Sequence, residues 1–280
     1  MSDPLIPGEA ACPDSNRGVT LPQLKFLNTA AFVLTLALNG LSSTGALSAY
    51  TVGEISDKHR TKITPAGAAF SIWGVIYLLQ GCFIAYQFFW PHGDELALLH
   101  GIGFWFLGAC AFNSLWIVTF VQGTNVAIWI STVLIACLLF CLCKIHLNAS
   151  CWARERPGGI TQTAVVDVHF SMYAGWVTVA TIVNVAVALT TTGWQVDSAT
   201  ANAWSVTMLL VALGLNLVIV ATRKDCVWGL VLAWASFWIA DANKDNDTVH
   251  ATALVVCAII TAVSIGVGAL LARAKGQGGK

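Results

Sequence analysis

The feature that most constrains this chain is the length of its segments without a charged residue. No Asp, Glu, Lys or Arg occurs from Leu96 to Cys143, and none occurs from Thr64 to Trp90. Because an α-helix rises about 1.5 Å per residue, either segment can cross the roughly 30 Å hydrocarbon layer of a bilayer. The chain is 57% hydrophobic and only 10% charged, whereas soluble domains carry about 25% charged residues. The sequence therefore predicts an all-α integral membrane protein, a polytopic helical bundle in contact with the lipid bilayer.

The charge-free windows also place the individual spans. They predict eight transmembrane helices, with seven as the alternative, because the window at 226–240 is short for a span. A polar loop is expected at 53–62, between the first two helices. The expected helices are approximately 26–47, 66–90, 102–121, 126–145, 168–189, 203–221, 226–240 and 249–271.

These windows divide the chain into four parts. Residues 1–25 are polar and rich in proline, so we expect a disordered tail. A five-helix bundle is expected at 26–190, three additional helices at 191–272, and a short basic tail at 273–280. With eight spans, ten of the fourteen Lys and Arg residues fall on the side of both termini. The positive-inside rule therefore predicts that both termini are cytoplasmic, without indicating which membrane holds the protein.

Zero net charge gives no reason to expect a nucleic-acid partner. The nine cysteines include no Cys-x-x-Cys pair and no Cys/His ligand spacing, so no metal site is assigned. The chain also contains no Walker loop and no G-x-S-x-G motif. We therefore assign no catalytic residue and no cofactor.

Aromatic and amide side chains inside the apolar windows are the first candidates for a functional site. Trp73 and Tyr77 lie four residues apart, so they share one helix face and stack. Their polar tips need partners, which either a helix-packing seam or a ligand pocket supplies. Asparagines inside lipid must bond a neighbouring helix, so we expect four of them to face the bundle: Asn39, Asn113, Asn184 and Asn216.

A stripe of small residues marks the last expected helix. Ala258, Ala262 and Gly266 recur every four residues and form one flat face. Such faces let two helix backbones approach closely. The stripe is predicted to pack against another helix, either within the chain or in a second copy, which makes a homo-oligomer possible.

Three motifs, in order, resemble the TspO/MBR family of tryptophan-rich sensory and translocator proteins. The second helix carries Pro65, Trp73, Tyr77 and Gly81; the third carries Asn113, Trp116 and Phe120; the fifth carries Tyr173, Trp176, Ala180, Thr181 and Asn184. The resemblance covers residues 26–189, so the first five helices look TspO-like. The chain departs from the family pattern at Ser71 and Met172, where the family usually has proline. It adds three C-terminal helices, as longer TspO-related membrane proteins do.

The resemblance implies a pocket between helices, covered by the first loop, that binds flat apolar ligands such as porphyrins or sterols. Seven residues are carried over as the expected ligand site: Trp73, Tyr77, Asn113, Trp116, Trp176, Ala180 and Asn184. The implied function is a binder, sensor or carrier of a small hydrophobic ligand. Two alternatives remain open: a membrane enzyme that degrades or modifies a tetrapyrrole, and a membrane protein whose aromatic residues only pack.

Overall fold

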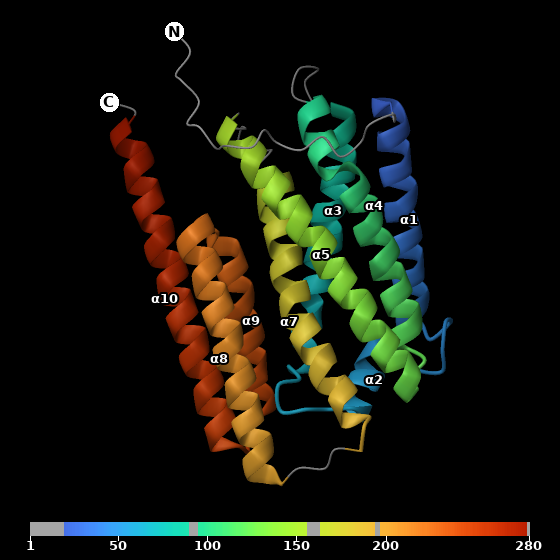
Figure 1. Cartoon of the computed structure of the whole chain (residues 1–280), viewed down its shortest axis with the longest axis vertical. Helices are drawn as coiled ribbons and strands as arrows, with labels where there is room; N and C mark the ends of the chain where they lie inside the picture. Colours follow the sequence, from blue (N-terminus) through green and yellow to red (C-terminus); the bar gives the residue numbers. More distant parts are fainter. Residues whose placement is uncertain (1–19, 90–94, 156–162, 194–196, 279–280) are drawn as a thin grey trace.

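The computed structural model is a bundle of helices that run along one common direction (Figure 1). It describes residues 20–89, 95–155, 163–193 and 197–278, and every regular element in these ranges is a helix. The predicted all-α, polytopic fold is confirmed. The elements are α1 Leu21–Ser43, α2 Val52–Lys58, η1 Gly67–Ser71, α3 Ile72–Phe89, α4 Glu95–Phe120, α5 Asn125–Glu155, η2 Thr163–Val168, α7 His169–Thr190, α8 Ser198–Arg223, α9 Cys226–Ala242 and α10 Asp247–Gly278.

Seven helices of the described chain are long and apolar enough to cross a membrane, and α9 is a shorter apolar helix. Its 17 residues rise about 25 Å, less than a typical hydrocarbon layer. One face of α9 is nevertheless packed inside the bundle, because Leu232, Ala235 and Ile239 are 3% exposed or less. The predictions of eight and of seven spans therefore differ only in how α9 is counted. The first described helix begins and the last one ends at the same end of the bundle (Figure 1).

The terminal helices are longer than their apolar windows. α1 begins at Leu21, inside the expected polar tail 1–25, and residues 1–19 lie outside the described ranges. Pro22 lies in the first turn, and the backbone N–H of Thr20 donates to Gln23 Oε1 at 3.0 Å. Both features are typical of a helix start. At the other end, α10 continues through the expected tail 273–280 as far as Gly278.

The polar loop expected at 53–62 is wrong in part, because Val52–Lys58 forms helix α2. A capping box starts this helix: Glu54 N donates to Thr51 Oγ1 at 3.3 Å, and Thr51 N donates to Glu54 Oε2 at 2.7 Å. Ile55 is fully buried and anchors α2 against the bundle. Gly123, in the turn between α4 and α5, has φ +62°, and an added Cβ there would collide with Ile55. Helix α2 therefore packs through Ile55 against the turn between α4 and α5.

The bundle has two groups of helices that meet at α7 and α9. α1, α3, α4, α5 and α7 form the first group, and α8, α9 and α10 lie beside it (Figure 1). Gly175 of α7 lets the two groups approach closely, because a Cβ at this position would lie 3.2 Å from Val231 Cβ and 3.4 Å from Trp228 Cα. Glycine at a helix crossing permits this backbone approach.

The expected inward orientation of the four asparagines is confirmed. Asn113, Asn184 and Asn216 are buried, and the half-buried Asn39 donates to Asn113 Oδ1 at 3.0 Å.

The small-residue stripe on α10 instead faces outward: Ala258, Ala262 and Gly266 are all exposed. It packs on no helix within the described chain. Self-association through this stripe stays a prediction.

Gly229 provides a test of packing within the second group. An added Cβ would collide with Ser264 Oγ of α10 and lie 2.8 Å from Val220 Cγ2 of α8. We expect Gly229→Val to lower stability by about 1–3 kcal/mol through overpacking. Gly214→Val is the matched control, because nothing lies within 4 Å of a Cβ at Gly214. Equal melting temperatures of the two purified variants would contradict this packing.

Candidate functional site

Stacked aromatic side chains from α3 and α4 occupy the bundle beside α2. Trp73 stacks on Tyr77, one turn further along α3, with ring centroids 5.5 Å apart and an interplanar angle of 20°. Trp73 also stacks on Trp116 of α4 at 6.1 Å and 28°. Trp116 in turn stacks on Phe120 at 5.5 Å. The predicted stacking of Trp73 and Tyr77 is confirmed, and it continues across to the facing helix. We call Trp73 and Trp116 the tryptophan wall.

A third indole, Trp176 of α7, meets this wall edge-on. Its ring centroid lies 6.4 Å from that of Trp73 and 6.0 Å from that of Phe70, with the planes nearly perpendicular. Such edge-to-face pairs are favourable. Trp176 is only 1% exposed, yet its Nε1–H has no hydrogen-bond partner among the described residues. An unpaired buried donor costs about 1–3 kcal/mol, so a ligand acceptor reaching this N–H would recover part of that free energy.

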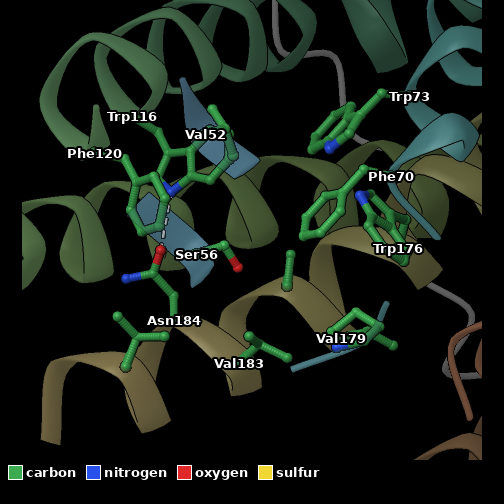
Figure 2. Close-up of a pocket in the computed structure, with 13 residues that line it drawn as sticks. Val52, Ser56, Phe70, Trp73, Trp116, Phe120, Trp176, Val179, Val183 and Asn184 are labelled. Atoms are coloured by element: carbon green, nitrogen blue, oxygen red, sulfur yellow. Dashed lines mark hydrogen bonds between the residues drawn. The ribbon is translucent and has the colours of Figure 1, made fainter. Parts of the chain in front are cut away.

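The tryptophan wall lines two hollows. The inner cavity has a volume of about 40 Å³, and Figure 2 shows its lining side chains. Ala180 of α7, one turn beyond Trp176, has a small side chain and so leaves space in this cavity. The cavity is lined by Val52, Ser56, Pro65, Phe70, Trp73, Trp116, Phe120, Trp176, Val179, Ala180, Val183, Asn184 and Val187.

The second hollow, the outer cleft, has a volume of about 490 Å³ and extends toward α1. It shares Val52, Phe70 and both residues of the tryptophan wall with the inner cavity. Ligand pockets for small molecules usually measure about 300–1,000 Å³. The outer cleft falls in this range and the inner cavity does not. The outer cleft is lined by Leu36, Asn39, Gly40, Ser43, Val52, Gly53, Gly67, Phe70, Trp73, Tyr77, Trp116 and Ile117.

Hydrogen bonds from Asn184 fix one side of the tryptophan wall. Trp116 Nε1 donates to Asn184 Oδ1 at 3.1 Å, the dashed line in Figure 2. The amide nitrogen of Asn184 donates to Thr132 Oγ1 at 2.7 Å and to Ser131 Oγ at 3.2 Å. One side chain of α7 therefore links α4 to α5 and sets the orientation of the Trp116 indole.

A second network lies behind Tyr77. Its hydroxyl donates to Asn39 Oδ1 at 2.7 Å, and the Asn39 amide donates to Asn113 Oδ1 at 3.0 Å. Asn113 Nδ2 then donates to the hydroxyl of Tyr173 at 3.0 Å. This chain of bonds joins α3, α1, α4 and α7. Asn113 is completely buried within it.

α2 covers the inner cavity with Val52 and Ser56. The capping box that starts this helix also affects the pKa of Glu54: hydrogen bonds first from the Thr51 backbone N–H and then from the Thr51 hydroxyl hold it below its usual value. Because the pKa is lower in the folded state, the capping bond stabilises α2 at neutral pH, and this contribution is lost as the pH falls through the lowered value.

Six of the seven residues predicted from sequence line one or both of the two hollows. Five line the inner cavity: Trp73, Trp116, Trp176, Ala180 and Asn184. Tyr77 lines the outer cleft, whereas Asn113 appears in the lining of neither hollow. Sequence reasoning missed Phe70, which lines both. Its one available signal was an aromatic residue three positions before Trp73, at the entry of the span.

A larger hollow of about 590 Å³ lies where α5, α7, α8 and α9 meet, and its lining includes several charged residues. Asp225, a partly buried carboxylate in this lining, accepts from Trp228 N at 3.0 Å and from the Ser171 hydroxyl at 2.6 Å. These bonds make Asp225 the cap of α9. No sequence-predicted site residue lines this hollow, so the aromatic site remains the candidate.

Comparison with known proteins agrees with the motifs that build this site. A family model described as "TSPO-like protein" matches residues 25–267, which includes both groups of helices. No curated protein and no solved structure gives a significant match. Because the family model covers most of the chain, this multi-pass membrane protein belongs to the TSPO-like family.

Proposed function

We propose that this protein binds flat, apolar ligands of the porphyrin or sterol class at the tryptophan wall. The observation that carries the proposal is the wall itself, which presents stacked indoles to two adjoining apolar hollows. Planar ring systems gain both buried apolar area and stacking from such surfaces. The residues that would hold the ligand are Trp73, Tyr77, Trp116, Trp176, Ala180 and Asn184.

The volumes of the two hollows indicate which of them the ligand enters first. The inner cavity, at about 40 Å³, is far below the size of an ordinary ligand site, whereas the outer cleft, at about 490 Å³, is within it. We infer that ligand enters the outer cleft and contacts Phe70, Trp73 and Tyr77. It reaches Trp176 and Ala180 when the inner cavity enlarges.

This binding activity supports a role as sensor or carrier. The deciding experiment titrates purified protein in nanodiscs with protoporphyrin and follows tryptophan fluorescence. Saturable quenching supports the binder, and a change in product absorbance over time supports the alternative of a tetrapyrrole-modifying enzyme. Absence of both favours the second alternative, in which the aromatic residues only pack.

Trp176 tests whether ligand reaches the inner cavity. We expect Trp176→Ala to weaken protoporphyrin binding by about 1–3 kcal/mol, the usual value of aromatic stacking on a planar base. This corresponds to a dissociation constant roughly tenfold to a hundredfold higher. Trp129→Ala is the control, because Trp129 is 42% exposed on α5 and lines neither hollow. Equal affinity of wild type and Trp176→Ala would remove the inner cavity from the site.

The substitution Trp73→Ala tests whether ligand binds at the tryptophan wall. Because Trp73 lines both hollows, Trp73→Ala should weaken binding at least as much as Trp176→Ala, again relative to Trp129→Ala. If Trp73→Ala alone weakens binding, the ligand stays in the outer cleft. Binding that tolerates Trp73→Ala would contradict the proposed site.

A substitution at Asn184 tests whether its hydrogen bond to Trp116 orients the tryptophan wall for binding. Asn184→Leu removes one acceptor for Trp116 and two bonds to α5. Because interhelical hydrogen bonds in membranes contribute about 0.6 kcal/mol each on average, we expect a loss of roughly 2 kcal/mol in stability and weaker protoporphyrin binding. Asn216→Leu is the matched control: Asn216 is similarly buried, but within the described chain its amide bonds Ala212 O of its own helix and no other helix. Equal losses in the two variants would argue against the role of Asn184.

A further inference from the structure

The segment Thr61–Ser71, here called the entrance segment, joins α2 to α3 and contributes to both hollows. Pro65 and Phe70 line the inner cavity, and Gly67 and Phe70 line the outer cleft. Any enlargement of the inner cavity toward ligand size on this side requires the segment to move. What holds it in place therefore bears on access to the candidate site.

One end of the entrance segment is bonded to the beginning of α8 and the end of α9. The ammonium group of Lys62 donates to Asn202 Oδ1 at 2.6 Å and to Ser198 Oγ at 3.0 Å. Asn243, the C-cap residue of α9, donates from Nδ2 to the Lys62 carbonyl at 2.9 Å. Lys62 is thus bonded through both its side chain and its backbone.

The middle of the segment is hydrogen-bonded to α9. Ala66 N donates to the Trp238 carbonyl at 3.0 Å, and Trp234 Nε1 donates to the Ala69 carbonyl at 3.1 Å. The segment contributes only backbone atoms to these two bonds and to the bond from Asn243. Residue identity within the segment therefore matters little for them, whereas the donors Trp234 and Asn243 of the second helix group are specific.

We propose that Trp234 and Asn243 are positioning residues of the candidate site, through which α9 holds the entrance segment closed and limits how fast ligand passes from the outer cleft into the inner cavity. The inference rests on the proposed binding function, and it assigns a role to the three helices beyond the five-helix bundle. The observed inner cavity of about 40 Å³ is the closed arrangement. Ligand passes into the inner cavity during the fraction of time in which the bonds from α9 to the segment are broken.

Trp234→Phe tests the proposal, because it keeps an aromatic ring and removes the N–H donor together with part of the indole. Trp238→Phe is the matched control on the same helix: the Trp238 side-chain N–H has no hydrogen-bond partner in the structure, and its backbone carbonyl remains. The first measurement is hydrogen–deuterium exchange of peptides covering residues 61–71, in nanodiscs without ligand. The second is the association rate of protoporphyrin, followed by tryptophan quenching and compared with its dissociation rate.

In Trp234→Phe, we expect exchange in the entrance segment and the association rate to rise together by roughly threefold to tenfold, the effect of losing one hydrogen bond. Trp238→Phe should match wild type in both. Asn243→Leu should act in the same direction as Trp234→Phe, with its exchange increase nearest Lys62, and serves as the second variant if Trp234→Phe folds poorly.

Each other outcome overturns a defined part of the proposal. Unchanged exchange in both Trp234→Phe and Asn243→Leu overturns the positioning role, whatever the ligand does. Increased exchange with an unchanged association rate overturns the control of access. If no form of the protein binds protoporphyrin, the proposed function fails for that ligand, and the exchange measurement still decides whether α9 holds the segment.

Discussion

A polar side chain within a bilayer must find its hydrogen-bond partner inside the protein, and the aromatic site depends on how two asparagines meet this requirement. Asn113 lies in the network that joins α1, α3, α4 and α7, and Asn184 joins α4, α5 and α7. Their partners include the polar ends of Tyr77, through Asn39, and of Trp116. The bonds that hold the helices together therefore also orient the rings.

Much of the fold could be predicted because lipid imposes simple rules on sequence. Helices must be apolar over a fixed length, so charge-free windows located every long helix. The i, i+4 spacing of Trp73 and Tyr77 predicted their stacking, since that spacing fixes a shared face. Inward-facing asparagines followed from the cost of an unpaired amide in hydrocarbon. In each case, a local pattern was enough.

Other features depend on tertiary contacts that no local pattern records. α2 lies in a polar stretch, and only its capping box and its buried Ile55 distinguish it from a loop. Phe70 belongs to a short 3₁₀ turn, where the helical periodicity that marked Trp73 is absent. No local pattern records that Asn113 bonds Asn39 and Tyr173, and its expected place in the ligand site stays a prediction. Which partner an amide selects depends on the assembled bundle.

The length of α9 gives the membrane itself a part in this arrangement. At about 25 Å, α9 is several ångströms shorter than a typical hydrocarbon layer. Leu230, Trp234 and Phe237 are exposed on its surface, so lipid beside α9 must thin or the helix must shift. Hydrophobic mismatch costs fractions of a kcal/mol per ångström, and one hydrogen bond contributes about as much. Bilayer thickness and the bonds from α9 to the entrance segment thus act on the same energy scale, on the same helix.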